Sequence, residues 1–243
     1  MFIRFLDRHD AGVALAKKLS SYANRENLLV LGLPRGGVPV AFEVAKALKA
    51  PLDVFVVRKL GAPHQEELAI GAVASGGISY LNREILGQLR IPQTQIDTIL
   101  KRESEAILQK ENRYREFRPS LPLLHQTIIL IDDGVATGST IMAALKAIRK
   151  HQPKTVIVAV PVTSKNAETT ISRFADAFVS AVSTDDFTSV GQFYEDFSPT
   201  QDEEVIRLLS QSHDATHCNF SQKQTSLPEK IPRNLLDSYP PLK

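Results

Sequence analysis

Two adjacent acids end an apolar run within the segment from residue 128 to residue 140. The segment has the sequence IILIDDGVATGST, in which four apolar residues precede the carboxylates of Asp132 and Asp133. The apolar residues predict a buried strand that would carry both acids to its carboxyl end. There the carboxylates could accept hydrogen bonds from the vicinal hydroxyls of a sugar or help to hold a divalent metal ion.

A loop of small and hydroxylated residues follows the acidic pair and leads into a predicted helix over residues 139–150. Such a loop leaves backbone N–H groups free at the start of the helix, where the helix dipole also favours an anion. The candidate phosphate-binding residues are Gly134, Val135, Ala136, Thr137, Gly138, Ser139 and Thr140. Carboxylates beside such a loop predict that the ligand is a sugar phosphate.

Other motifs fit this segment less well. A P-loop requires the pattern GxxxxGK[ST], whereas Gly134 and Gly138 are too close together and no lysine follows. The dinucleotide fingerprint GxGxxG is absent, and the paired acids of a receiver domain would follow the first strand rather than the third. The simplest alternative is a strand end with an aspartate cap on the next helix, which needs only one acid.

A second candidate anion site follows an earlier apolar run, at residues 33–39 with the sequence LPRGGVP. Gly36 and Gly37 allow backbone geometry that other residues resist. Arg35 would lie at a strand end, where an anion could approach exposed N–H groups. A plain strand-to-helix turn explains the two glycines equally well.

Two cations, Arg58 and Lys59, follow the next apolar run. Both would leave the sheet beside the second anion site, where arginine can bind a phosphate through two hydrogen bonds. Residues 60–80 then form a candidate lid, because their glycines would permit closure over the site. Within this lid, Glu67 or His64 could act as a general acid or base, although an exposed loop glutamate is more often only solvated.

Five apolar runs rich in β-branched residues predict the buried strands of a mainly parallel sheet. The predicted strands span residues 28–33, 52–57, 127–131, 155–162 and 177–182. The predicted helices that separate them span residues 38–48, 93–117, 139–150 and 167–174. This alternation is typical of a doubly wound α/β fold, in which ligands bind beyond the carboxyl ends of the strands. Residues 58–82 interrupt the alternation and predict a loop with one or two short strands.

The segment with the two acids resembles the phosphoribosyl pyrophosphate (PRPP) signature of the type I phosphoribosyltransferase family. That signature is an apolar strand, two acids and a small-residue loop containing Thr-Gly. The resemblance covers about residues 8–185 and implies that Asp132 and Asp133 bind the ribose hydroxyls while residues 136–140 hold the 5-phosphate. Family members that act on 6-oxopurines usually have an aspartate in place of Ala136, so this loop is more similar to that of the adenine branch.

The same resemblance assigns roles to the other loops. It implies that the pyrophosphate is bound by Arg35, Gly36, Gly37, Arg58 and Lys59. Arg58 and Lys59 would also be catalytic residues, with Glu67 as a further candidate. A small hood at about residues 183–200 would cover the base. We therefore expect a type I phosphoribosyltransferase-like fold with a hood and a flexible lid.

The implied activity is the Mg²⁺-dependent transfer of the 5-phosphoribosyl group of PRPP to a purine or pyrimidine base, with release of pyrophosphate. Mg²⁺ would arrive with PRPP and could also contact Asp132 and Asp133. The family implies a homodimer and a role in nucleotide metabolism. The alternative is a PRPP-binding sensor or regulator that transfers nothing.

The composition of the chain is typical of an ordinary soluble globular protein. Its 243 residues include 29 Lys and Arg against 27 Asp and Glu, so a net charge of +2 gives no reason to expect a nucleic-acid partner. Early charges argue against a signal peptide, and no apolar run approaches the ~20 residues that cross a bilayer. We therefore expect a cytoplasmic protein with no membrane segment.

The two ends of the chain carry weaker signals. An amino-terminal helix is expected to be capped by Asp10 and to end near Ser20. The phosphoribosyltransferase-like domain is expected to span residues 1–213, and the polar residues 214–243 predict a mobile tail. Near this boundary lie His213, His217 and the single cysteine Cys218; the histidine spacing is compatible with zinc, but the sequence offers no further ligand.

Overall fold

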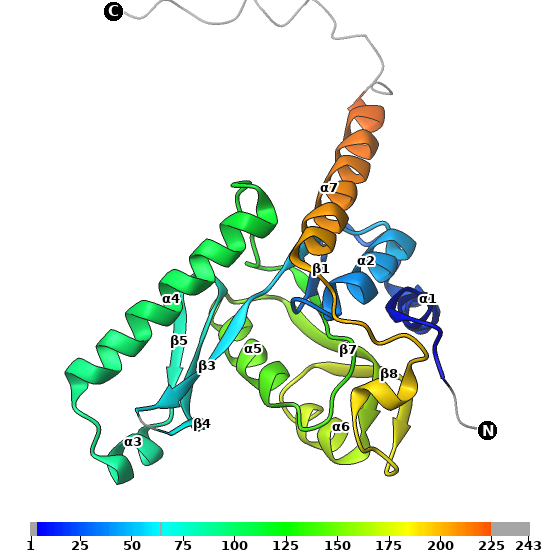
Figure 1. Ribbon diagram of the computed structural model, residues 1–243. Helices are drawn as coiled ribbons and strands as arrows, with labels where there is room; N and C mark the ends of the chain where they lie inside the picture. The colour runs from blue at the N-terminus through cyan, green and yellow to red at the C-terminus, as the bar shows by residue number, and fades with distance from the viewer. Residues whose placement is uncertain (1–3, 64, 225–243) are drawn as a thin grey trace, which may run out of the picture.

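The computed structural model describes residues 4–63 and 65–224, without the side chains of residues 66, 67 and 216–224. Its centre is a five-stranded parallel sheet with the strand order β2-β1-β6-β7-β8. The strands are β1 (Leu28–Gly32), β2 (Leu52–Val54), β6 (Thr127–Ile131), β7 (Thr155–Ser164) and β8 (Ala177–Thr184). All five were predicted, and the doubly wound α/β class is confirmed (Figure 1).

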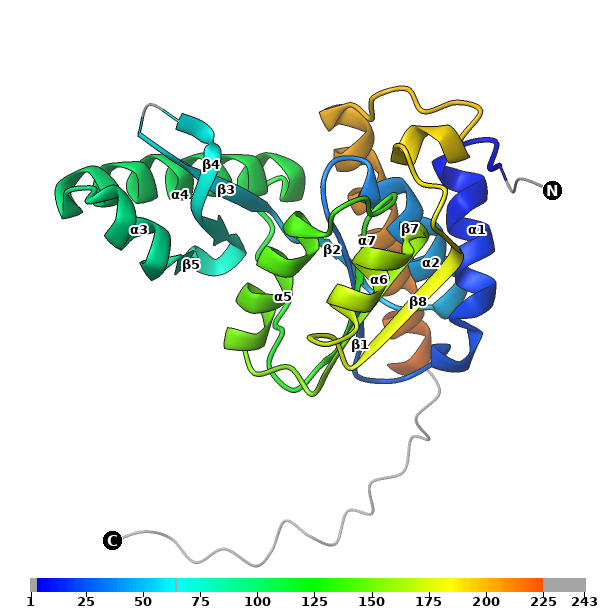
Figure 2. The same cartoon turned by 90° about the horizontal axis from the view of Figure 1, so that it is seen from below.

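Helices cover both faces of this sheet, because alternate residues of each strand point to opposite sides and nearly all are apolar. Val30 belongs to the core on one face and Leu31 to the core on the other. The first face is covered by α1 (Arg8–Lys18), α2 (Gly37–Leu48) and α7 (Asp202–Gln224). The second is covered by α5 (Ser139–Lys150) and α6 (Lys165–Ile171), as Figure 2 shows.

The amino-terminal helix α1 starts earlier than predicted. Its cap is Asp7, whose Oδ1 accepts a hydrogen bond of 2.8 Å from the Asp10 N–H. A capping residue stands just before the first helical residue, so Asp10 lies in the first turn and the predicted cap was wrong. The 3₁₀ helix η1 (Ser20–Tyr22) ends this segment.

Helix α7 corrects the prediction of a polar tail from residue 214, because the helix continues to Gln224. Its first turn contains three acids, Asp202, Glu203 and Glu204, which favour a helix amino terminus. The buried side chains that anchor it to the core follow at helical spacing: Val205, Leu208 and Leu209. The rest of the predicted tail, residues 225–243, lies outside the described residues. Within the described part of the chain, no helix is both long and apolar enough to cross a membrane.

A second, three-stranded sheet lies where a loop with one or two short strands was predicted over residues 58–82. It is antiparallel and consists of β3 (Val57–Ala62), β4 (Gln65–Ala74) and β5 (Ile78–Leu81). The 3₁₀ helix η2 (Ser75–Gly77) joins β4 to β5, and α3 (Arg83–Leu89) and α4 (Gln93–Arg115) follow. We call residues 57–115 the arm; it projects from the core on the left of Figures 1 and 2.

Helix α4 was predicted, but the sheet of the arm was not, because its strands are rich in glycine and alanine, which have low intrinsic strand propensity. Packing stabilises them instead. Leu60, Ile70 and Val73 form a small core with Ile107 of α4. The arm also contacts the main core, since Lys150 of α5 donates a hydrogen bond of 2.8 Å to the Ser79 carbonyl.

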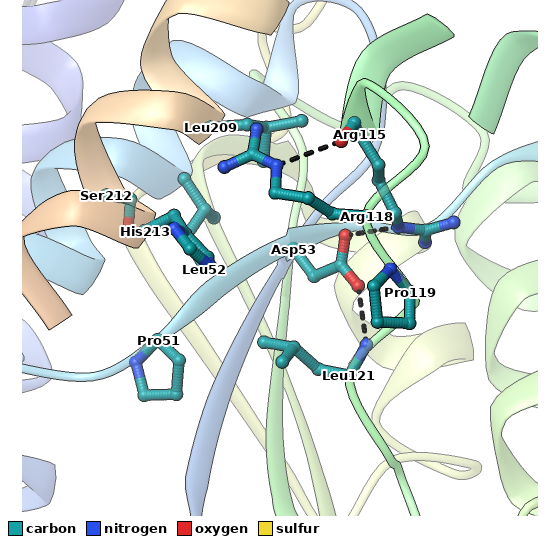
Figure 3. A pocket seen from close by; sticks show the side chains of 10 residues that line it. All are labelled: Pro51, Leu52, Asp53, Arg115, Arg118, Pro119, Leu121, Leu209, Ser212 and His213. Carbon is teal, nitrogen blue, oxygen red and sulfur yellow. Dashed lines mark hydrogen bonds and ion pairs between the residues drawn. The ribbon is translucent and has the colours of Figure 1, made fainter. Parts of the chain in front are cut away.

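A small apolar pocket of about 130 Å³ lies between α7, β2 and the segment that follows α4 (Figure 3). It opens beside Pro51 and Leu52, where β2 begins. The pocket is therefore at the amino ends of the parallel strands. Ligands of doubly wound sheets bind at the carboxyl ends, so the pocket is not the expected functional site.

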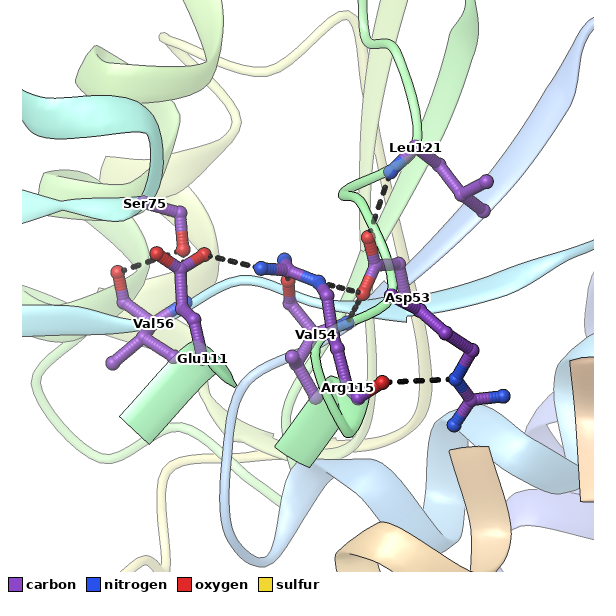
Figure 4. Close-up of polar contacts among 8 residues, drawn as sticks. Asp53, Val54, Val56, Ser75, Glu111, Arg115 and Leu121 are labelled. Carbon is purple, nitrogen blue, oxygen red and sulfur yellow. Dashed lines mark hydrogen bonds and ion pairs between the residues drawn. The ribbon is translucent and has the colours of Figure 1, made fainter. Parts of the chain in front are cut away.

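A buried ion-pair network attaches the arm to the core next to this pocket (Figure 4). Arg115 lies 2.8 Å from Asp53 of β2 and 2.7 Å from Glu111 of α4, and it also donates to the Val54 carbonyl. The other Asp53 oxygen accepts a hydrogen bond of 3.0 Å from the Leu121 N–H. All three charged side chains are nearly inaccessible to solvent. The end of α4 is thus fixed to the edge strand of the parallel sheet.

Candidate functional site

The acidic pair lies at the carboxyl end of β6, next to the loop that follows β1. A Cβ atom added to Gly36 would lie 2.0 Å from Asp133 Oδ2, and one added to Gly37 would lie 2.7 Å from the Ile131 carbonyl oxygen. Only glycine permits such close approach at these two positions. The Pro34–Arg35 peptide bond in the same loop is cis. Two of the predicted site segments, far apart in the sequence, are therefore in direct contact.

Arg8, in the first turn of α1, holds the second acid. Its Nε donates to Asp133 Oδ2 over 2.8 Å, and its Nη1 donates to the Ser198 carbonyl over 2.8 Å. Its guanidinium lies 4.0 Å from the centre of the Phe197 ring. The Tyr194 hydroxyl donates to the Asp133 carbonyl over 2.6 Å. The position of Asp133 is thus determined by α1 and by the segment after β8.

The two carboxyl groups differ in their surroundings. Burial raises the pKa of Asp132 well above its usual value, and the neighbouring Asp133 raises it further. Burial also raises the pKa of Asp133, but the charge and hydrogen bond of Arg8 oppose this increase. The Asp133 N–H donates to Asp132 Oδ1 over 2.9 Å. Asp133 is therefore the acid whose negative charge is better compensated.

The predicted phosphate loop, residues 134–140, runs from the acidic pair into the start of α5. The loop is attached to the end of β7: the Val135 N–H donates to the Val162 carbonyl, and the Ser164 hydroxyl donates to the Ala136 carbonyl. Gly138 has a φ of 80°, a left-handed conformation that suits glycine. The loop side chains of Thr137, Ser139 and Thr140 are exposed. This combination of a fixed loop and an open helix start suits an anion.

The predicted hood, residues 183–200, packs on the core through its aromatic side chains. Phe193 and Tyr194 are buried, and the ring centres of Phe187 and Phe193 are 5.2 Å apart. The segment contains the 3₁₀ helix η3 (Val190–Phe193), which reaches the phosphate loop: a Cβ added to Gly134 would lie 2.5 Å from Val190 Cγ1. The hood thus borders the predicted site, and its contact with a base remains a prediction.

Arg35 points toward the start of α7 and the end of α4. Its Nη1 lies 3.9 Å from Asp202 Oδ1. The same carboxylate accepts hydrogen bonds from the Tyr114 hydroxyl (2.8 Å) and from Arg113 (2.9 Å). Lys110 lies one turn before Tyr114, with its Nζ 5.6 Å from the centre of the tyrosine ring. We call these five residues the cationic junction.

The predicted pair Arg58 and Lys59 is exposed on β3, at the base of the arm. Arg58 Nε lies 2.5 Å from Glu103 Oε2 on α4, and Glu103 also binds Arg102. A groove of about 820 Å³ beside β3 and α4 is lined in part by Arg58, Lys59 and Arg102. These residues belong to an ordered sheet rather than to the loop that was predicted here; closure of the segment as a lid remains a prediction.

The structure describes the remaining candidate residues only in part. Glu67 lies on β4, but its side chain is outside the described atoms, and His64 is outside the described residues. His213 lies on α7 with its Nδ1 3.7 Å from Asp214, and the side chains of His217 and Cys218 are not described. In the part of the chain that the structure describes, no group of three or more His, Cys, Asp or Glu side chains could hold a metal ion.

Three neighbours of the site, Arg8, Lys110 and Asp202, were not found from the sequence. Arg8 is 125 residues from its partner Asp133, and no motif connects the two. Asp202 could have been recognised only as part of an acidic helix start. Lys110 and Tyr114 are four residues apart and so lie on one face of a helix. This spacing does not indicate that the face lies at the site.

These features define a doubly wound α/β protein with an acidic pair and an anion-type loop at the carboxyl edge of its sheet. The family model of the phosphoribosyl transferase domain matches residues 6–198 of the chain. The chain therefore belongs to the phosphoribosyltransferase family, as the acidic-pair segment suggested.

Two relatives are similar to the chain over most of its length. The chain is 40% identical over 209 residues to a Mycobacterium tuberculosis (strain H37Rv) protein named as a putative phosphoribosyl transferase; the match covers 86% of this chain and 47% of that protein. The chain thus spans about half the length of this relative. It is also 40% identical to the crystallised protein TT1426 from Thermus thermophilus, with a TM-score of 0.75, over 86% of this chain and 99% of that one.

A shorter match involves the bifunctional protein PyrR of Deinococcus radiodurans. It is 29% identical over 121 residues, which are 47% of this chain and 64% of PyrR.

Proposed function

We propose that the protein is a phosphoribosyltransferase that uses PRPP and transfers its 5-phosphoribosyl group to a purine or pyrimidine base, releasing pyrophosphate. The observation that carries this proposal is the contact between the acidic pair and the Gly36-Gly37 loop beside the start of α5. A single ligand at this edge would meet two acids, a phosphate-type loop and the arginine of the β1 loop. PRPP has the matching groups: ribose hydroxyls, a 5-phosphate and a pyrophosphate.

Each part of the site has a role in this reaction. Displacement of pyrophosphate at the anomeric carbon places positive charge on the ribose and negative charge on the leaving group. Asp132 and Asp133 would hold the ribose hydroxyls, and the loop from Gly134 to Thr140 would hold the 5-phosphate, so that the sugar is fixed for attack by the base. Arg35 would offset the charge of the pyrophosphate as it leaves.

Arg58 and Lys59 would assist Arg35 when the ligand is bound. Because Arg58 is paired with Glu103, it would have to share its guanidinium with that carboxylate or exchange partners. Glu67 remains the candidate acid or base for the acceptor, and the hood would cover that acceptor. The proposal includes a homodimer only because members of the family usually pair their subunits.

The residues present also suit Mg²⁺. Mg²⁺ is usually bound by one or two carboxylates together with substrate phosphates, and Asp132 and Asp133 supply neighbouring carboxylates. Since the described residues include no larger cluster of metal ligands, the ion would be held mainly by PRPP. When bound, Mg²⁺ would supply positive charge beside the pyrophosphate.

Isothermal titration of PRPP, with Mg²⁺ and then with a chelator, tests the proposal. We expect saturable binding that weakens when Mg²⁺ is removed, and Asp133→Asn should weaken it while the fold is retained. A screen of nucleobases for pyrophosphate release then identifies the acceptor. Absence of PRPP binding would overturn the proposal, whereas tight binding without turnover on any base would support the non-catalytic sensor instead.

A further inference from the structure

Lys110 of α4 interacts with the charge of Asp202 but forms no ion pair with it. The side chain is half-buried, and its nearest recorded contact is the Tyr114 ring. Among the described side chains, no carboxylate lies within ion-pair distance of its Nζ, whereas Arg113 on the same helix contacts both Asp202 and Glu203. A half-buried ammonium group without a direct ion pair remains available to bind a negatively charged ligand.

The surroundings of Lys110 connect it to both predicted pyrophosphate-binding arginines. Burial lowers the pKa of Lys110; Asp202 opposes this shift, and the charges of Arg35 and Arg58 add to it. Contacts also connect Lys110 to Arg35: the Lys110 Nζ lies 5.6 Å from the Tyr114 ring centre, and the Tyr114 hydroxyl donates to Asp202, which lies 3.9 Å from Arg35. Lys110 belongs to α4 of the arm and Arg35 to the core, so this chain of contacts joins the two parts.

The acid at this place is already shared. Asp202 accepts hydrogen bonds from Tyr114 and Arg113 and lies 3.9 Å from Arg35. Glu103 is likewise shared, between Arg58 and Arg102. The cationic junction contains three cations, Arg35, Lys110 and Arg113, but one carboxylate, Asp202; only Arg113 has a further acidic partner, Glu203, among the ion pairs of these described side chains. This excess of positive charge favours binding of a multiply charged anion.

We propose that Lys110 is a pyrophosphate-binding residue that acts together with Arg35. This inference rests on the proposed function, since pyrophosphate reaches this place as part of PRPP. The ammonium group is a compact point charge that can contact a terminal phosphate oxygen. Because Lys110 belongs to the arm and Arg35 to the core, the bound pyrophosphate bridges these two parts of the protein.

The test compares Lys110→Met with Lys110→Arg and with a matched control, Lys101→Met, an exposed lysine on the same helix. Affinities for two probes, pyrophosphate with Mg²⁺ and ribose 5-phosphate, are measured by calorimetric titration. Lys110→Met should lose about tenfold or more in affinity for pyrophosphate, as expected for one charge-assisted contact. Its affinity for ribose 5-phosphate should be unchanged, and Lys110→Arg and Lys101→Met should bind both probes like the parent protein.

The two probes separate failure of this inference from failure of the proposed function. If the parent protein binds both probes and Lys110→Met binds pyrophosphate equally well, the role of Lys110 is refuted while the proposed function stands. Equal losses for both probes would also refute it, because they indicate a structural effect. If the parent protein binds neither probe nor PRPP, the proposed function itself fails.

Discussion

The two acids at the end of β6 are adjacent in the sequence but have different surroundings. Arg8 faces Asp133 at 2.8 Å, whereas Asp132 is surrounded by backbone and by its neighbour. The charge of Arg8 acts on Asp132 without a direct ion pair, so the negative charge of Asp132 is the less well compensated of the two.

We predict that Asp132→Asn raises the melting temperature at neutral pH. Burial raises the pKa of Asp132 in the folded state, so between the unfolded and folded pKa values the native state holds more protons than the unfolded state. Stability then falls as the pH rises through this range, and the full penalty is present above the folded-state pKa. Thermal denaturation as a function of pH should show a parent curve that declines with pH more steeply than the curve of the variant.

Asp176 is the control for Asp132, because its pKa is shifted in the opposite direction. Its bond to Arg149 lowers its pKa, and it also accepts a hydrogen bond from the Val156 N–H. Its stabilising contribution is present above the unfolded pKa and is lost as the pH falls through the folded one. Asp176→Asn should thus lower the melting temperature at neutral pH. A similar decrease in both variants would contradict the interpretation of Asp132.

Gly36 supports a second prediction at this scale. Gly36→Ala would place a methyl group 2.0 Å from Asp133 Oδ2, so the β1 loop and the acidic pair would have to separate. We expect a loss of about 1–3 kcal/mol in the free energy of unfolding, measured by urea denaturation, together with weaker PRPP binding.

The control for Gly36 is Gly87 in α3, where an added Cβ would meet no atom within 4 Å. Gly87→Ala should be neutral or should stabilise the protein by roughly 0.5–1 kcal/mol, because alanine is the better helix former. If Gly36→Ala were equally harmless, the two loops would not be in the close contact described.

Helix α4 both packs on the antiparallel sheet and attaches the arm to the core, and the attachment lies at its carboxyl end. Its apolar side packs on the antiparallel sheet, and its last turns contribute both the Arg115 network and the cationic junction. The attachment of the arm therefore determines where Lys110 lies relative to the core.

Loss of the Arg115 network should loosen this attachment. Arg115→Met leaves Asp53 and Glu111 buried without their cation, and we expect a loss of about 3–5 kcal/mol in the free energy of unfolding. The matched control is Arg113→Met on the same helix, whose ion pairs are half-exposed and should contribute less than about 1 kcal/mol. Similar small losses in urea denaturation of both variants would show that the network does not anchor the arm.

The elements differ in how well the sequence predicts them. Strand β6 is predictable because a continuous apolar run is what a strand covered on both faces requires. The antiparallel sheet of the arm is not predictable, because β4 is held by contacts with α4 and contains small residues that carry little local signal. The end of α7 is also hard to predict, because residues 214–224 are mostly polar in the sequence and the apolar residues that pack on the core precede them.

For the whole molecule, the proposed site joins the core to the arm. The acidic pair and the phosphate loop are predictable from one contiguous segment, since the strand, the loop and the helix start follow each other in the sequence. Arg8, Lys110 and Asp202 come from three other elements; Arg8 reaches Asp133, and Asp202 reaches Arg35, only in the folded protein. Sequence patterns describe local structure, so such long-range neighbours are beyond their reach.

Hydrogen exchange tests the joining of core and arm. We predict that PRPP with Mg²⁺ slows amide exchange in residues 134–140 and also in residues 107–115 of α4, because a bridging ligand stabilises both parts. Amide exchange in residues 20–26, which precede β1 at the amino ends of the strands, should be unaffected. Protection confined to the core would mean that the arm contributes nothing to binding.

The position of Asp202 also bears on how the site is completed during protein synthesis. Arg35 and Tyr114 are translated well before Asp202, which follows the last strand of the parallel sheet. All five strands can therefore pair while the cationic junction still lacks the carboxylate that it shares. At that stage Arg35 and Tyr114 have no acidic partner from α7, and Asp202 reaches them only when the start of α7 leaves the ribosome.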